Sequence, residues 1–78
     1  MALKYVKTAK KEIIVFPGSL GHDDFQYLHP VSAGFINMHY SPKQDKIVFA
    51  CYGESKSLGL KSHEEDSRYA QIQLGEEW

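Results

Sequence analysis

The sequence predicts a small α+β domain, with a mixed and mostly antiparallel sheet of about four strands and two short helices in the order ββαββα. Four runs rich in β-branched and aromatic residues alternate with turn-forming segments, as strands do. Two further segments carry helix-start signals. The 78 residues make a single domain, residues 1–78, of a size that buries only about 60% of its unfolded surface.

The first two strands are expected over residues 3–8 and 12–16, with a turn over residues 9–11 between them. Both segments hold the aromatic and β-branched residues that favour strands. Pro17 ends the second strand, because proline donates no hydrogen bond to a ladder. A glycine-containing loop over residues 18–21 follows.

A short helix is expected next, over residues 22–28. Asp23 and Asp24 fall in its first turn, where negative charge interacts favourably with the helix dipole. This role explains the pair of carboxylates without catalysis. His29 and Pro30 end the helix, because the residue before a proline is pushed out of the helical region.

The third and fourth strands are the longest apolar runs, residues 31–40 and 46–52, and residues 41–45 form a hairpin-length connection. Gly34 lies inside the third strand, which indicates a bulge or a close approach by another backbone. The polar stretch over residues 53–61 is expected to be irregular.

The second helix is expected to begin at Ser62. Ser62 and Glu65 match the S-x-x-E capping box, in which each side chain bonds the backbone N–H of the other residue. Gly75 is a suitable terminator. The residues expected on one face of this helix are Tyr69, Ile72 and Gln73.

Both faces of the predicted sheet are apolar, whereas a sheet with one wet face should alternate apolar and polar residues. Along the third strand, the set Val31, Ala33 and Phe35 alternates with the set Ile36, Met38 and Tyr40. Two short helices of roughly twenty residues in total cover about one face. We therefore expect a second copy of the chain, or another protein, to cover the other face, around Ile36, Met38 and Tyr40 or in the opposite register.

The segment that joins the fourth strand to the last helix has two interpretations. It is a recognition loop, since loops on rigid scaffolds often carry binding, or it is a connector pinned to the core by Leu58 and Leu60. The residues that a recognition loop would use are Glu54, Ser55, Lys56, Ser57 and Lys61.

The charge of the chain is balanced overall and uneven along its length. The net charge of −1 argues against a generic polyanion binder. The basic residues Lys4, Lys7, Lys10 and Lys11 gather near the N-terminus, and Glu64, Glu65, Asp66, Glu76 and Glu77 near the C-terminus. The strand aromatics and these lysines leave a second hypothesis open, a nucleic-acid-binding accessory protein.

No residue pattern amounts to a catalytic signature. Cys51 lies mid-strand among apolar residues, where cysteine usually acts as a small buried hydrophobe. The dispersed His22, His29, His39 and His63 have no metal-ligand spacing. We therefore predict that the protein is no enzyme and has no catalytic residue, metal or cofactor, with a small thiol or histidine enzyme as the third hypothesis.

The single cysteine excludes an internal disulfide, so a reducing cytoplasm is the expected location. The first eleven residues, MALKYVKTAKK, lack the apolar run of a signal peptide. No apolar stretch approaches the about 18 residues of a membrane span. We expect no contact with a membrane.

Two motifs give a resemblance that covers about half of the chain. Residues 31–35 read VSAGF and residues 51–55 read CYGES, followed by SLGL, Ser62 and Glu65–Asp66. They are similar to small uncharacterised proteins of bacteria and their prophages. No activity is attached to such proteins, so the resemblance implies a bacterial or phage accessory protein and assigns no site residue. The preferred hypothesis is a protein that acts by protein–protein contact, as a homodimer.

Overall fold

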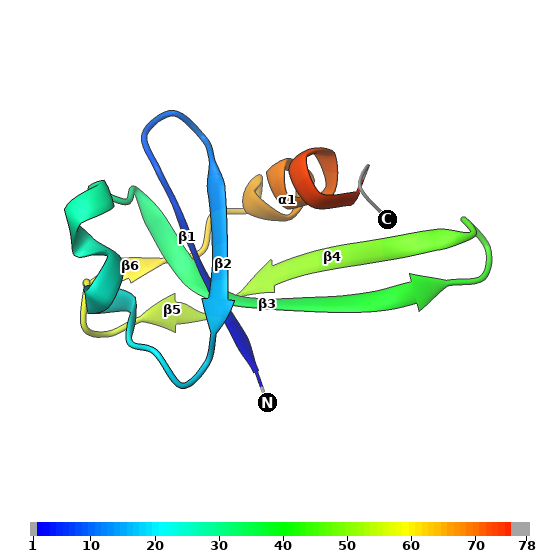
Figure 1. The fold of residues 1–78 in the computed structure, drawn as a ribbon. Helices are drawn as coiled ribbons and strands as arrows, with labels where there is room; N and C mark the ends of the chain where they lie inside the picture. Colours follow the sequence, from blue (N-terminus) through cyan, green and yellow to red (C-terminus); the bar gives the residue numbers. More distant parts are fainter. Residues whose placement is uncertain (1, 76–78) are drawn as a thin grey trace.

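The computed structural model describes residues 2–75 and has the predicted α+β class, with every strand pair antiparallel (Figure 1). The stretch over residues 53–61, which the sequence predicts to be irregular, instead contains a small hairpin. The elements are β1 (Leu3–Lys7), β2 (Ile13–Pro17), the 3-10 helix η1 (His22–Leu28), β3 (Ser32–Ser41), β4 (Lys46–Tyr52), β5 (Glu54–Ser55), β6 (Leu60–Lys61) and α1 (Asp66–Leu74).

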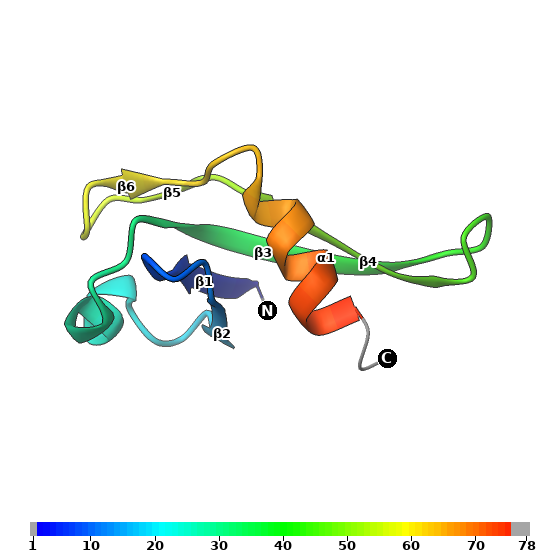
Figure 2. The same cartoon turned by 90° about the horizontal axis from the view of Figure 1, so that it is seen from above.

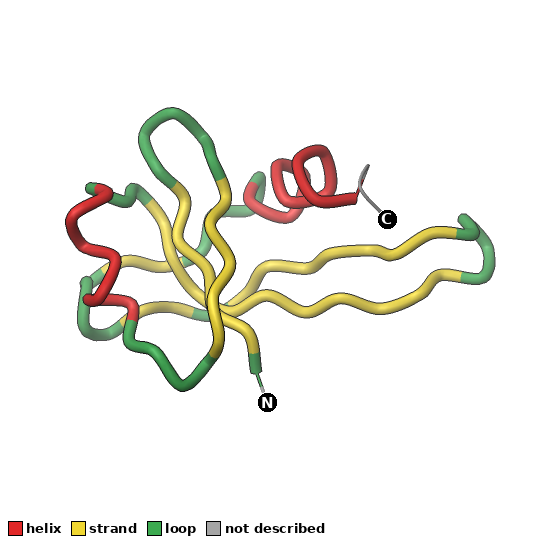
Figure 3. The backbone as a smooth tube through the Cα atoms, viewed as in Figure 1, coloured by secondary structure: helices red, strands yellow, loops and turns green. Residues whose placement is uncertain are grey.

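The main sheet has the strand order β2-β1-β3-β4, and β5 and β6 form a separate two-stranded sheet. The long strand β3 changes partners along its length. Its first half pairs with β1 up to Ile36, and its second half pairs with β4 alone. Residues 37–50, called the arm below, therefore form a two-stranded ribbon that extends away from β1, β2 and η1 in both views (Figures 1 and 2). Figure 3 shows strand along both sides of this ribbon and a short turn at its tip.

Each face of the main sheet has its own apolar core. On one face α1 places Ala70 against Tyr5, Ile13, Ile36 and Phe49. On the other face, side chains of η1 and of the segment over residues 58–60 cover the buried set Val6, Phe16 and Ala33; the covering residues are Phe25, Leu28, Leu58 and Leu60. The expectation that the helices cover only one face is therefore wrong for this part of the sheet, because the two helices lie on opposite faces and the β5–β6 hairpin assists η1.

Gly34 marks a close approach between backbones, as predicted. A Cβ atom at this position would lie 2.4 Å from the carbonyl oxygen of Tyr52. The register of β3 with both neighbours is continuous, so the strand has no bulge here. Gly53, at the bend from β4 into β5, has a φ of 76°, in the left-handed region that glycine enters without strain.

The predicted helix over residues 22–28 is confirmed, as a 3-10 helix. Its first turn is fixed by Asp24, whose Oδ2 accepts the Gly21 N–H at 3.0 Å. His29 ends it with a φ of 51°. Inside the helix, His22 is buried, and its Nε2 lies 2.8 Å from the carbonyl oxygen of Gly34.

The second helix begins four residues later than expected, and the predicted Ser62–Glu65 capping box is wrong. The Ser62 hydroxyl donates to the carbonyl oxygen of Gly53 instead, at 2.9 Å, and Glu65 caps nothing with its side chain. Asp66 takes over: its Oδ2 accepts the His63 N–H at 3.0 Å, and its own N–H donates to the His63 carbonyl at 3.0 Å. The helix faces are also shifted, because Ile72 is 51% exposed while Ala70 is buried.

Polar side chains of α1 bind the backbone at both edges of the main sheet. The Gln71 amide donates to the Ile47 carbonyl and accepts the Phe49 N–H, both at 3.0 Å, and so mimics the peptide group of a neighbouring strand. Ser67 accepts the Cys51 N–H at 2.8 Å. At the opposite edge, Gln73 accepts the Ile13 N–H at 2.8 Å. Edge strands that are left open invite pairing with other chains, so α1 protects β4 and the start of β2.

Candidate functional site

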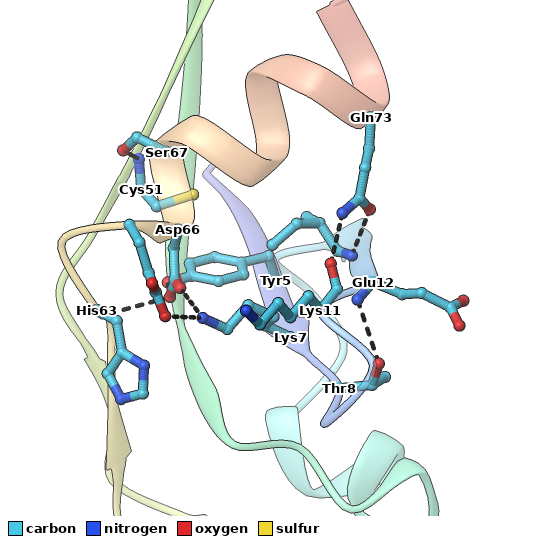
Figure 4. Close-up of polar contacts among 12 residues, drawn as sticks. Tyr5, Lys7, Thr8, Lys11, Glu12, Cys51, His63, Asp66, Ser67 and Gln73 are labelled. Carbon is cyan, nitrogen blue, oxygen red and sulfur yellow. Dashed lines mark hydrogen bonds and ion pairs between the residues drawn. The ribbon is translucent and has the colours of Figure 1, made fainter.

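A buried polar cluster ties α1 to β1 (Figure 4). Lys7 and Asp66 are 2% and 0% exposed, and their Nζ and Oδ1 atoms lie 2.7 Å apart. The Tyr5 hydroxyl donates to the other carboxylate oxygen of Asp66, which also accepts the His63 N–H. Glu65, half exposed, lies 3.1 Å from the Lys7 ammonium and gives it a second carboxylate. Every charge in the cluster therefore has a partner.

The contacts within the cluster favour the charged forms of Asp66 and Lys7 and the neutral form of the Tyr5 hydroxyl. Burial opposes the charge on Asp66, but hydrogen bonds from Lys7, Tyr5 and the His63 backbone outweigh it and lower the pKa of Asp66. Burial likewise opposes the charge on Lys7, yet Asp66 and Glu65 raise its pKa. Burial and the bond to Asp66 raise the pKa of Tyr5 well above its ordinary value. These pKa shifts favour an ion pair between Asp66 and Lys7, which anchors α1 to β1.

Cys51 lies beside this cluster and is half-buried. Burial and the nearby Asp66 carboxylate raise the pKa of the Cys51 thiol to about 11. A nucleophilic cysteine needs the opposite shift, since the thiolate is the reactive form. The groups that act on the pKa of the Cys51 thiol are Asp66, Ser67, Tyr5 and Lys7, and no histidine is among them.

The position of Lys7 in its predicted strand indicates a buried lysine, which a count of the charged residues does not reveal. In a strand, residues i and i+2 share a face, so Lys7 must point to the same face as Leu3 and Tyr5. That face is apolar, and a lysine on it needs a buried carboxylate as its partner. Nothing local in the acidic run Glu64–Asp66 indicates that Asp66 is that partner.

The four N-terminal lysines do not gather into one patch. Lys7 is buried in the ion pair, and the Lys11 Nζ lies 5.3 Å from the centre of the Tyr69 ring. Lys4, on the opposite face of β1, donates to the carbonyl oxygen of Leu20 at 2.8 Å. Lys10 lies exposed in the β1–β2 turn. Of the acidic residues named for the C-terminal end, Glu76 and Glu77 lie outside the described residues.

The histidines are as dispersed in space as in sequence. His22 packs edge-on against Phe16 and Phe35, while His29, His39 and His63 are exposed. Over residues 2–75, no three His, Cys, Asp or Glu side chains lie close enough together to hold a metal ion.

The segment between β4 and α1 is pinned to the core, as its connector interpretation expects, through Leu58 and Leu60. Ser55 is only 2% exposed, and its Oγ accepts the Leu58 N–H at 3.3 Å, so it shapes the turn rather than facing a ligand. The other members of the candidate recognition loop are exposed: Glu54, Lys56, Ser57 and Lys61.

Two open grooves flank the end of η1, and neither reaches the polar cluster. One, of about 270 Å³, is lined by Gln26, His29, Pro30, Leu58 and Leu60. The other, of about 390 Å³, is lined by Thr8, Ala9, Lys10, Glu12, Ile14, Leu28 and His29. Tyr5, Lys7, Cys51 and Asp66, whose pKa values are shifted, therefore do not line these two grooves.

The candidate interface residues separate into two environments. Ile36 is 2% exposed and belongs to the intramolecular core beneath α1, so it is not available to a partner. Met38 and Tyr40 are on the same face of β3 and reach into the arm, where they are 40% and 54% exposed. The Tyr40 hydroxyl donates to Asp45 at 2.5 Å, which holds the ring along the arm. The candidate surface therefore narrows to the arm.

A scan against protein-family models and searches of curated proteins and of solved structures find no match to this chain. The resemblance to prophage-type proteins thus stays a prediction. In the described part of the chain, no helix is both long enough and apolar enough to cross a membrane.

Proposed function

We propose that the protein acts by protein–protein contact, as a small bacterial or phage accessory protein of the cytoplasm that pairs with a second copy of itself through the arm. The observation that carries the proposal is the departure of β3 from β1 after Ile36. A two-stranded ribbon is marginal by itself in water. α1 binds the β4 strand of this ribbon through Gln71, but its β3 strand, residues 37–41, has no second neighbouring strand among residues 2–75 and exposes Met38 and Tyr40. Contact with a partner would stabilise the ribbon and remove both side chains from water.

The competing hypotheses have less support. A nucleic-acid surface built on the four N-terminal lysines would require Lys7, which is buried, to be free. A thiol enzyme would require a lowered pKa at Cys51, which is raised. A different protein in place of the second copy is the remaining alternative, and it would use the same arm.

Sedimentation equilibrium over a dilution series tests the proposal. The chain has a mass of 8.9 kDa, and we expect the weight-average mass to rise towards twice that value with concentration. Met38→Lys should hold the protein at the monomer mass, since a charge would be buried in the contact. Ile72→Lys is the matched control, because Ile72 is 51% exposed but lies on α1 outside the arm; it should dimerise like the wild type. A folded Met38→Lys variant with unchanged dimerisation would refute the placement on the arm.

A further inference from the structure

The open side of the arm can be worked out from the alternation of hydrogen bonds in the sheet. In an antiparallel ladder, the backbone groups of alternate residues point to opposite sides. On β4, the N–H groups of Phe49 and Cys51 point outward, to Gln71 and Ser67 of α1. Their neighbours Val48 and Ala50 must therefore bond to β3, where they stand opposite His39 and Asn37.

The other set of residues on β3 then faces β1. Ser32, Gly34 and Ile36 belong to this set, and they stand opposite Lys7, Tyr5 and Leu3, where β1 begins. Met38 and Tyr40 continue this set beyond the first residue of β1. Their N–H and carbonyl groups therefore point to a side of the arm along which no strand of residues 2–75 runs.

This open edge contrasts with the edges that the fold protects. Side chains of α1 bind the backbone of β4 and the start of β2, and Pro17 ends β2 without an N–H. Natural sheets guard their edges with lysine, proline or a covering element. Residues 37–41 read NMHYS and hold neither lysine nor proline, so the edge lacks these guards until Pro42.

The same five residues are complementary to themselves. When a second copy is placed antiparallel with His39 opposite His39, each Met38 stands beside a Tyr40, and the four outward groups of each copy meet the four of the other. On the α1 face this brings methionine sulfur against an aromatic ring, a favourable contact. On the other face Asn37 stands beside Ser41 and His39 beside His39, so no lysine, arginine, aspartate or glutamate meets a like charge across the contact.

We infer that two copies join by antiparallel pairing of their β3 strands over residues 37–41, with the two-fold axis at His39, to give a continuous β4-β3-β3-β4 ribbon. The inference rests on the proposed function and adds the register. Pairing is limited to these residues, because Ile36 already stands opposite Leu3 and Pro42 has no N–H to donate. The contact is therefore short, and the fraction of dimer should change with protein concentration in the measurable range.

Disulfide trapping tests the register, in a Cys51→Ala background that removes the single native cysteine. His39 is exposed, so His39→Cys should not disturb folding. In the inferred register the two Cα atoms at position 39 form a non-hydrogen-bonded pair about 4.5 Å apart, within the roughly 4.4–6.8 Å that a disulfide spans. The control Asn37→Cys places its two Cα atoms about 13 Å apart, since four residues of strand separate them.

We expect the His39→Cys dimer to crosslink under mild oxidation roughly tenfold faster than Asn37→Cys or Ser41→Cys, whose cysteines exceed disulfide reach. The double variant with Asn37→Cys and Ser41→Cys should crosslink as well, because these two positions face each other. If the protein is a dimer by sedimentation and Asn37→Cys crosslinks while His39→Cys does not, the register is wrong and the proposed function stands. If the wild type is a monomer throughout, both fail.

Discussion

Replacing Asp66 with asparagine removes the negative half of the buried ion pair and leaves the Lys7 ammonium in place, 2% exposed. Breaking a buried pair on one side costs about 3–5 kcal/mol, because a charge stays buried without its partner. Glu65 remains 3.1 Å from the ammonium, although it is 54% exposed. We therefore expect the lower end, about 3 kcal/mol, from a total that is roughly 4–12 kcal/mol for a domain of this size.

Urea unfolding followed by circular dichroism measures this loss. At the roughly 1 kcal/mol per molar slope of a small domain, the midpoint should fall by about 3 M. Lys7→Met combined with Asp66→Asn should cost less than the two single changes added together, since the double variant buries no unpaired charge. A loss below about 1 kcal/mol in Asp66→Asn, outside the effect of a broken buried pair, would refute the view that this pair anchors α1.

Three further predictions concern the edges, the core and the pH dependence. Gln71→Met removes two hydrogen bonds to β4 and should lower the free energy of unfolding by about 1–3 kcal/mol in the same urea assay, with more self-association by light scattering because an edge is opened; unchanged values would show that the edge needs no cap. Gly34→Ala should destabilise more than Gly59→Ala in thermal melts. A Cβ at Gly34 meets backbone at 2.4 Å, whereas one at Gly59 meets nothing within 4 Å, and alanine there bears only the cost of a left-handed backbone at φ 66°, about 1–2 kcal/mol; equal losses would contradict the close approach. Stability should be lost in acid as the pH falls through the lowered pKa of Asp66, because the unfolded chain binds that proton first. In base it should be lost between the ordinary pKa of cysteine, 9.0, and the folded pKa of Cys51, about 11, because the unfolded chain releases the thiol proton first. Tyr5, whose pKa is also raised, adds to the loss above its ordinary pKa of 10.0, so Cys51→Ala should reduce the loss between pH 9.0 and 10.0, and an unchanged loss in that range would contradict the assignment.

The strands could be predicted closely because their signal is local. The expected strand over residues 46–52 coincides with β4, and the other three strands shift by one residue at one or both ends. Pro17 ends its strand as expected. The runs of β-branched and aromatic side chains set these bounds with little influence from distant residues.

The start of α1 could not be predicted from local pattern, because a distant contact decides it. Ser62 and Glu65 satisfy the capping-box pattern, yet the Ser62 hydroxyl bonds Gly53 and Asp66 bonds Lys7, 59 positions away in the chain. Tertiary contacts of this kind override a capping preference worth about 1 kcal/mol.

The extent of the arm could not be predicted from the sequence either. Ile36, Met38 and Tyr40 form one regular apolar series, and only the register of β3 with β1 divides it into a buried residue and two exposed ones. The register depends on where β1 begins relative to β3, and no residue pattern in either strand predicts that position. The sheet does have a second apolar face, as the sequence pattern indicates, and elements of the same chain cover most of it.

Amide hydrogen exchange by NMR, at low and at high protein concentration, tests the central claim about the arm most directly. The account predicts that the Met38 and Tyr40 amides exchange quickly in dilute protein and become protected as the concentration rises. The His39 amide, which bonds to β4, should be protected at both concentrations. Met38 and Tyr40 amides that exchange at the same rate across the full concentration range would contradict pairing through this edge.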